Sequence, residues 1–327
     1  MQYEEKGRLI RGVGGLYEIE LQAGDTPLSG ERVTARAKGN FRHEGVTPLV
    51  GDLVRVGFDE GSLAKDESGR LRSGGDGGGI VIEEILPRKN ALIRPPMANL
   101  DMLFITFAAA HPTPALETVD KLISIAEYNG IEPVIVIGKR DMAPDYADEL
   151  QKSYTVCGFS AFSLSAETGE GVEALRAFLQ AHAKGKTAAF AGASGVGKST
   201  LLNKLFPTLS LQTGEISRRI ERGKHTTRRV ELYPLSDPVD AYMADTPGFS
   251  MLDFVRFDFF SKEELAGTMR EFEPYIGACR YKKCTHTREE GCAILEAVQA
   301  GRIPESRHRS YVGMFDALKN KHDWSKK

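Results

Sequence analysis

Residues 192–200 read GASGVGKST, a spacing of glycine, lysine and serine that can wrap a chain of phosphates. The glycines let successive backbone N–H groups face one concavity, and the N-terminus of the following helix adds partial positive charge. Lys198 is predicted to reach the β and γ phosphates, and the Ser199 hydroxyl to ligate Mg²⁺. A glycine turn with a chance Lys-Ser pair is the alternative, but a strand before the loop and a helix after it favour the phosphate site. The predicted nucleotide contacts here are Gly192, Ala193, Ser194, Gly195, Val196, Gly197, Lys198, Ser199 and Thr200.

Two later segments suit the γ-phosphate and its metal ion. DTPG ends an apolar strand, so Asp245 can hold Mg²⁺ through water and the Gly248 N–H can meet the γ-phosphate. In ERGKHTTRRVEL, Thr226 or Thr227 is expected to close over Mg²⁺ and the γ-phosphate, unless the pair only begins a strand. The predicted magnesium ligands are therefore Ser199, Thr227 and Asp245.

The base is expected to be read earlier in the chain. GKRD, beginning at Gly138, resembles the [NT]-K-x-D motif of GTPases, in which the aspartate accepts hydrogen bonds from guanine N1 and N2. Adenine cannot donate those bonds, so Asp141 predicts guanine, and the Lys139 stem is expected to lie along the base. SAETGEG resembles the element whose backbone N–H meets guanine O6, at Ser165 and Ala166. Gly138 replaces the usual Asn or Thr, which removes a contact that normally ties this loop to the phosphate loop or to the base.

Apolar strands and amphipathic helices alternate from residue 100 onward, which predicts a mostly parallel α/β sheet covered on both faces. The expected strands are 101–109, 132–138, 161–166, 187–192, 228–235 and 240–245, and the expected helices are 115–129, 146–154, 171–183 and 198–206. In this order the base-reading pair precedes the phosphate elements, whereas most GTPases have the reverse order. The pattern therefore predicts a circularly permuted P-loop GTPase domain.

The first 88 residues read as short strands with polar turns, which suggests a small β-barrel. LYEIEL and DLVRVGF alternate apolar and polar residues, RVTARAKGNF does so more weakly, and SGGDGGG at residues 73–79 is expected to be a mobile loop. Basic residues crowd this part, and Phe41 is expected to be available for stacking on a base. A solvated face is the alternative to RNA binding. The predicted RNA contacts here are Arg32, Arg36, Lys38, Phe41 and Arg42.

Three of the four cysteines fall within CRYKKCTHTREEGC, together with one histidine. Three thiolates and one imidazole make a closed tetrahedral set, which is the structural type of zinc site. The spacing is not the common C-x₂-C pair, and disulfide pairing is an alternative that a reducing compartment disfavours. Cys157 lies on an apolar stretch and is expected in the core. The predicted ligands of one structural zinc are Cys279, Cys284, His286 and Cys292, with Lys282 and Lys283 beside them as RNA contacts.

Composition sets few further limits. The chain has 327 residues, enough for two or three domains, and its net charge of −2 gives no global attraction to nucleic acid. Any RNA binding must therefore rest on local patches. The N-terminus lacks a basic-then-apolar signal and no apolar run is long enough to cross a bilayer, so a cytoplasmic protein without a membrane partner is expected.

The permuted order, RKNALIRPPMANLDMLFI, GKHTT and the late cysteine cluster together resemble the ribosome small-subunit-dependent GTPase A family, over essentially the whole chain. The resemblance implies an N-terminal OB-fold at residues 1–88, a permuted GTPase domain at 89–254, and a mainly helical zinc domain with a basic tail at 255–327. It also implies a monomeric GTP hydrolase that acts in late maturation of the small ribosomal subunit. Its expected partners are the subunit with its rRNA, which stimulates turnover, and GTP or GDP with Mg²⁺.

The catalytic residues depart from a common GTPase pattern. Phe249 follows DTPG, where many GTPases carry the glutamine that orients the attacking water, and an apolar ring cannot do that. His225 is the nearest candidate, as the family resemblance also suggests, although a loop histidine can simply be solvated. The predicted catalytic residues are thus His225, Lys198 and Thr227.

Two functions of other classes compete with a GTPase. An ATP-dependent enzyme can use the same phosphate loop, but Asp141 argues against it because adenine cannot satisfy that carboxylate. An RNA-binding module with weak nucleotide turnover is the second. The intact Lys198, Ser199 and Asp245 argue against that interpretation.

Overall fold

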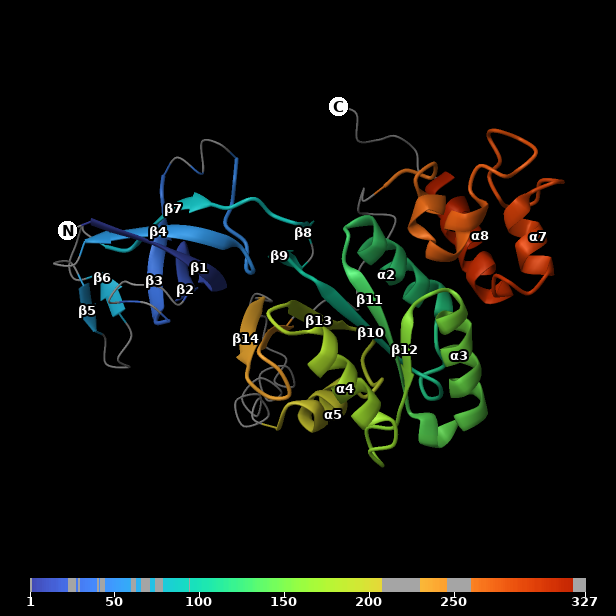
Figure 1. Cartoon of the computed structure of the whole chain (residues 1–327), viewed down its shortest axis with the longest axis horizontal. Coiled ribbons are helices and arrows are strands. Elements are labelled where there is room, and N and C mark those ends of the chain that lie inside the picture. Colours follow the sequence, from blue (N-terminus) through green and yellow to red (C-terminus); the bar gives the residue numbers. More distant parts are fainter. Residues whose placement is uncertain are drawn as a thin grey trace.

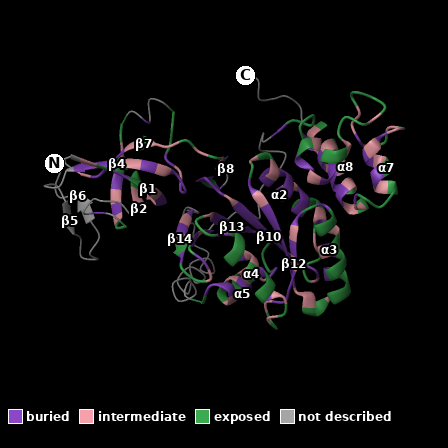
Figure 2. Cartoon of the chain, viewed as in Figure 1, coloured by how far each residue is buried: buried purple, intermediate pink, exposed green. Residues whose placement is uncertain are grey.

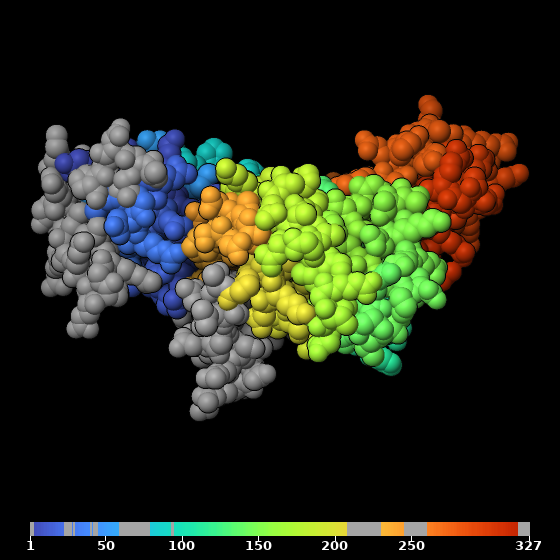
Figure 3. Space-filling view, turned by 60° about the horizontal axis from the view of Figure 1, so that its bottom comes forward, coloured from blue at the N-terminus to red at the C-terminus, as the bar shows by residue number. Residues whose placement is uncertain are grey.

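The computed structural model has three parts, which run from N-terminal strands through a central sheet to C-terminal helices (Figure 1). In the space-filling view these parts follow one another along the molecule, and the segment around residues 230–245, in orange, touches the blue N-terminal part (Figure 3). The structure describes residues 2–22, 28, 30–39, 41, 45–59, 63–65, 71–73, 79–93, 95–207, 230–245 and 260–319.

Five N-terminal strands close into a barrel. β1 (Gln2–Val13) pairs with β2 (Leu16–Leu21), β2 with β3 (Arg32–Ala37), β3 with β7 (Val81–Ile85), β7 with β4 (Leu53–Asp59), and β4 again with β1. Only the β3–β7 pair is parallel. A closed ring of five strands is the architecture of an OB-fold, so the predicted barrel is confirmed. The short strands β5 (Leu63–Lys65) and β6 (Leu71–Ser73) extend the sheet beyond β3.

The central sheet is mainly parallel. Its strand order is β12 (Ser160–Ser163), β11 (Glu132–Gly138), β10 (Met102–Ala108), β13 (Thr187–Ala191), β15 (Ala241–Asp245), with β14 (Glu231–Leu235) antiparallel at the end. Every residue of β10 is buried, as expected of a strand covered on both faces (Figure 2). The alternation of strands and helices predicted from residue 100 onward is therefore confirmed.

Two pairs of helices cover the two faces of this sheet. Leu103 and Ile105 of β10 pack in one cluster with α2 (Leu116–Tyr128) and α3 (Pro144–Val156). Phe104 points the other way and packs in a second cluster with α4 (Val172–His182) and α5 (Lys198–Leu205). Because side chains alternate along a strand, the positions on β10 are divided between these two cores.

The barrel and the central sheet form one continuous sheet. β1 of the barrel pairs antiparallel with β14 through Arg11 and Glu231, whose side chains also lie 3.9 Å apart as an ion pair. Arg8 donates to Thr187 Oγ1 at 2.7 Å and lies over the Tyr242 ring. A hairpin of β8 (Ala91–Ile93) and β9 (Pro96–Ala98) follows the barrel in the chain, and its Met97 bridges to Val50, just before β4.

The C-terminal part packs on α2. It comprises η4 (Leu265–Thr268), η5 (Arg270–Tyr275), α7 (Ala293–Gln299) and α8 (Glu305–Lys319), and its apolar cluster includes Ile125 of α2. Arg307 of α8 is 1 % exposed. It pairs with Asp120 of α2 at 2.5 Å and with Glu271 of η5 at 2.7 Å. The basic tail predicted from the sequence therefore loses Arg307, which is an internal cation.

Some predictions differ from the structure or lie outside it. The long strand β1 was not predicted, because Gly7 interrupts its alternation: a Cβ there would lie 2.5 Å from Ile19 Cγ2. Of the predicted glycine-rich loop, residues 74–78 are not described. Among the described residues, no helix is long and apolar enough to cross a membrane.

Candidate functional site: a nucleotide cavity and a Cys₃His cluster

The phosphate loop connects β13 to α5 and is shaped by glycines with positive φ. Gly195 has φ 79° and Gly197 φ 96°, conformations that side-chain-bearing residues rarely adopt. Lys198 Nζ donates to the carbonyl oxygens of Gly192 at 2.5 Å and Ala193 at 2.8 Å. Burial lowers the pKa of this amine. The lysine side chain thus folds back onto the start of the phosphate loop, and its predicted contact with a phosphate stays a prediction.

The base-reading loop follows β11 and is braced from both sides. Lys139 has φ 57° and its Nζ donates to the His111 carbonyl. Arg140 lies in the short helix η2 (Arg140–Met142) and donates to Glu170 Oε1 at 2.8 Å and Ser163 Oγ at 3.1 Å. Asp141 is exposed beside these fixed residues. The backbone that carries Asp141 is therefore held by its neighbours, and its side chain is accessible.

The segment after β12 lies against this loop. Ser165 is fully buried, its N–H donates to the Glu170 carbonyl at 2.9 Å, and its Oγ accepts from the Thr168 N–H at 3.2 Å. The Ser165 N–H is thus used within the turn. Ala166 is the partly exposed residue that the segment offers to a ligand. Ser165 therefore shapes the turn, and the predicted contacts of Ser165 and Ala166 with guanine stay predictions.

These separate segments line one cavity of about 230 Å³. Its base side is formed by residues near the ends of β11 and β12, and its phosphate side by the loop before α5. The lining residues are Thr106, Gly138, Lys139, Asp141, Met142, Leu164, Ala166, Glu167, Val196, Gly197, Thr200 and Leu201. Thr106, Met142 and Leu201 belong to the cavity without a sequence signal, since only the folded sheet brings them there.

The γ-phosphate side is described only in part. The backbone of Asp245 ends β15, and Ala244 pairs with Ala189 in the strand that leads into the phosphate loop. His225, Thr226, Thr227 and Gly248 lie outside the described residues. Their predicted contacts with Mg²⁺, water and the γ-phosphate therefore stay predictions.

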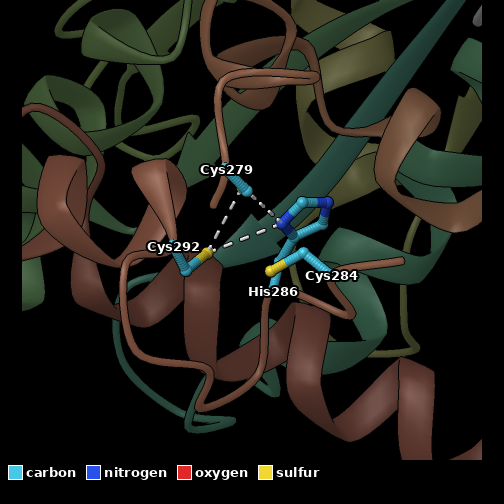
Figure 4. Close-up of side chains that lie close together, drawn as sticks. All are labelled: Cys279, Cys284, His286 and Cys292. Atoms are coloured by element: carbon cyan, nitrogen blue, oxygen red, sulfur yellow. Dashed lines mark hydrogen bonds between the residues drawn. The ribbon is translucent and has the colours of Figure 1, made fainter. Parts of the chain in front are cut away.

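The Cys₃His cluster is assembled in the C-terminal part, as Figure 4 shows. The donor atoms of Cys279, Cys284, His286 and Cys292 all lie within 4.8 Å of one another. His286 Nδ1 is 3.5 Å from Cys279 Sγ and 3.5 Å from Cys292 Sγ, and the two sulfurs are 3.9 Å apart. A disulfide needs an S–S distance of about 2.05 Å, so no pair here is bridged.

These distances fit a tetrahedral metal site. With Zn–S and Zn–N bonds of ordinary length, the edges of the tetrahedron measure about 3.8 Å between sulfurs and about 3.5 Å from sulfur to nitrogen. Burial lowers the pKa of His286, which favours the neutral imidazole that a metal requires. The His286 carbonyl also accepts from His308 Nε2 at 2.8 Å, so α8 supports the site. The cluster can hold a metal ion.

The predicted RNA contacts have different environments. Arg36, Lys38, Lys282 and Lys283 are exposed, Arg32 is half-buried beside Glu20, and Arg42 is not described. Phe41 is only 7 % exposed and belongs to the barrel core. This corrects the predicted stacking role, because a ring packed among barrel side chains offers no face to a base. Tyr281, 49 % exposed beside Arg280, is an aromatic ring that the sequence reasoning passed over.

Comparison with known proteins agrees with this architecture. Residues 85–255 match the family model of the RsgA GTPase, and residues 6–64 match that of the RsgA N-terminal domain. The chain is 39% identical over 317 residues to the small ribosomal subunit biogenesis GTPase RsgA of Caldanaerobacter subterraneus subsp. tengcongensis, covering 97% of this chain and 96% of the relative. Its identity to the Alkaliphilus metalliredigens protein of that name is 38%, covering 96% and 98%.

Two solved structures have the same overall arrangement. YjeQ from Thermotoga maritima superposes with a TM-score of 0.73 at 31% identity, covering 98% of this chain and 100% of that one. YloQ, described as a circularly permuted GTPase, superposes with a TM-score of 0.72 at 29% identity, covering 98% and 96%. The chain therefore belongs to the RsgA family of small ribosomal subunit biogenesis GTPases.

Proposed function

We propose that this GTPase binds its nucleotide in the cavity between the base-reading loop and the phosphate loop. One observation carries the proposal: Asp141 and Ala166 line the same cavity as Val196 and Gly197, although these residues lie far apart in the sequence. The guanine edge then meets Asp141 and the Ala166 N–H. The phosphates lie along the loop that ends at Lys198, where backbone N–H groups and the helix N-terminus favour anions.

The residues around the γ-phosphate complete the proposed reaction site. Ser199 and Asp245 are suitably placed in the chain to hold Mg²⁺, with Thr227 as the third ligand; bound Mg²⁺ neutralises charge that develops on the phosphates. Lys198 supplies a fixed positive charge from within the loop. His225 is proposed to orient the attacking water, because the apolar Phe249 cannot do so.

The guanine assignment is tested by exchanging one carboxylate for an amide. Asp141→Asn should weaken the binding of GTP and strengthen the binding of xanthosine triphosphate. The asparagine amide can donate to the xanthine carbonyl, whereas the aspartate carboxylate can only accept a hydrogen bond. Asp145→Asn, an exposed carboxylate in the first turn of α3, is the matched control and should leave both affinities unchanged. Equal binding of ATP and GTP by the parent protein, or no exchange of preference in Asp141→Asn, would contradict the assignment.

We infer that the Cys₃His cluster binds one structural zinc ion. Three thiolates and one imidazole fill a tetrahedral zinc shell and leave no open position for catalysis. The observed distances between the donor atoms support this, as does the packing of α7 and α8 around the cluster. The zinc then stabilises the C-terminal part. The proposed domain limits are residues 1–88 for the barrel, 89–254 for the GTPase domain and 255–327 for the C-terminal part.

We further infer that the chain binds the small ribosomal subunit through its rRNA, acts late in maturation as a cytoplasmic monomer, and hydrolyses GTP faster when bound. The names of the similar proteins support the subunit as partner. Exposed Arg36 and Lys38 on the barrel and Lys282 and Lys283 beside the cluster support RNA contacts at both ends. GTP turnover should rise when purified small subunits are added, and His225→Ala should lose most of that rise. Equal rates with and without subunits would contradict this inference.

A further inference from the structure

Thr106 has a buried hydroxyl group at the carboxyl end of β10. The residue is 2 % exposed, and its Oγ1 has no hydrogen-bond partner among the residues that the structure describes. Buried hydroxyls normally have a partner, because an unmet polar group destabilises the fold. Thr106 also lines the nucleotide cavity. A buried polar group without a partner at a ligand cavity indicates that its hydrogen bond forms only when the ligand is bound.

Strand register places Thr106 close to Gly138. Thr106 pairs with Val136 in the parallel ladder of β10 and β11, so Gly138, two residues further along β11, is its diagonal neighbour. Phe104 and Val136 both belong to the cluster under α4 and α5. By alternation, Thr106 and Gly138 lie on that same face of the sheet, beneath the phosphate loop.

The phosphate loop approaches both residues closely. A Cβ at Gly138 would lie 3.2 Å from the Val196 carbonyl oxygen, and a Cβ at Gly192 would lie 2.0 Å from the Thr106 carbonyl oxygen. The loop therefore begins directly against Thr106 and passes over Gly138. The side chain missing at Gly138 would have met Val196, and the Thr106 hydroxyl is the neighbouring hydrogen-bond donor on the same face.

We propose that Thr106 is a positioning residue for the bound nucleotide, and that its hydroxyl replaces the side chain missing at Gly138. In the nucleotide-bound state the hydroxyl donates to the Val196 carbonyl, directly or through one water beside the Gly138 Cα. This bond ties the phosphate loop to the base-binding strands. The bond acts through the phosphate loop and not on the edge of the base, so it strengthens the binding of GTP and of GDP by the same factor. The proposal rests on the nucleotide site proposed above.

The test compares Thr106→Val with Thr106→Ser. Valine keeps the shape and removes only the hydroxyl, so GTP and GDP affinity should each fall about three- to tenfold, the worth of one hydrogen bond. Serine keeps the hydroxyl and should retain most of the affinity. Without nucleotide, Thr106→Val should melt at the parent temperature or above, because a methyl group replaces an unpartnered hydroxyl. Unchanged affinity in Thr106→Val, or an equal loss in Thr106→Ser, would overturn the proposal.

A second variant tests whether the two positions serve one contact. Gly138→Asn brings an amide donor next to Val196 and should restore most of the affinity in the Thr106→Val background, while changing the parent less. Simple additivity of the two substitutions would overturn the shared contact. Asp141→Asn, measured in parallel, separates the two levels of inference. If Asp141→Asn changes the preference from guanine to xanthine and Thr106→Val binds nucleotide as the parent does, only the role of Thr106 is wrong. If Asp141→Asn does not change the preference, the proposed site itself is wrong.

Discussion

The two ends of the central sheet are joined to their neighbours by different chemistry. The C-terminal part is held by a buried ion cluster of Arg307, Asp120 and Glu271 and by an apolar cluster that includes Ile125. The barrel is held by strand pairing between β1 and β14, by polar contacts of Arg8 and Arg11, and by apolar side chains that share one buried cluster with the central sheet. The first join is distinguished by its buried ion cluster, whereas the second is distinguished by a backbone pairing that continues the sheet.

The two joins also lie next to different halves of the proposed nucleotide site. The C-terminal part packs on α2 and reaches α3 through Arg307, which lies over the Tyr154 ring. In the chain these two helices precede and follow β11 and the base-reading loop. The barrel contacts β14 and the neighbouring β15, which connect to the two segments that carry the γ-phosphate residues. We therefore expect the C-terminal part to move with the base half and the barrel to respond to the γ-phosphate half.

The largest expected effect is loss of the metal. Cys284→Ser should reduce zinc content from about one equivalent to near zero and unfold the helices around the cluster, because binding energy at such sites is folding energy. Cys157→Ala, which changes a buried cysteine outside the cluster, is the control and should retain the metal. Full zinc content in Cys284→Ser would contradict the ligand assignment.

Breaking the buried ion cluster should have the next largest effect. Arg307→Ala leaves two buried carboxylates without their cation and should lower the free energy of unfolding by about 3–5 kcal/mol. Arg309→Ala on the same helix is the control, since its pair with Glu305 is about three-quarters exposed and should contribute less than about 1 kcal/mol. Denaturant unfolding of both variants measures the difference. Equal small losses would show that the join does not depend on the ion cluster.

The same cluster predicts a pH dependence. Burial raises the pKa of Asp120 above its ordinary 3.8, more than Arg307 lowers it. Between pH 3.8 and the raised value the folded protein binds more protons than the unfolded chain, so stability should fall as pH rises through that window. Asp120→Asn cannot titrate and should reduce this slope. An unchanged slope in denaturant unfolding at several pH values would assign the dependence to other groups.

Loss of the polar contacts of Arg8 at the barrel join should have the smallest effect. Arg8→Ala removes the bond to the buried Thr187 hydroxyl and the contact with the half-buried Tyr242 ring. It should lower stability by only about 1–2 kcal/mol. Thermal unfolding of this variant beside Arg307→Ala ranks the two joins directly. A loss as large as that of Arg307→Ala would remove the distinction between them.

Sequence patterns predicted those features of the fold that depend on residues close together in the chain. The continuous apolar run MLFITFA required a strand buried on both faces, and the spacing of three cysteines and one histidine required only a short segment to close. The buried role of Arg307 within the predicted basic tail could not be predicted, because its partner Asp120 lies 187 residues away in the sequence.

Two further features were beyond local reasoning for similar reasons. The pairing of β1 with β14 joins Arg11 to Glu231, which lie 220 residues apart in the sequence, and no local pattern encodes it. The predicted stacking ring of Phe41 sits in a stretch of basic residues, but the barrel uses it to fill its core. The roles predicted from the sequence were wrong or missing for residues whose partners come from distant segments of the chain.

Nucleotide control of subunit binding is tested most directly by measuring the affinity for purified small subunits in GDP and in a non-hydrolysable GTP analogue. If the γ-phosphate reshapes the segments connected to β14 and β15, the analogue should tighten subunit binding. By linkage, the subunit should raise the affinity of the protein for the analogue, relative to its affinity for GDP, by the same factor. Equal subunit affinity in the two nucleotide states would contradict a GTP-dependent ribosome-binding role for this chain.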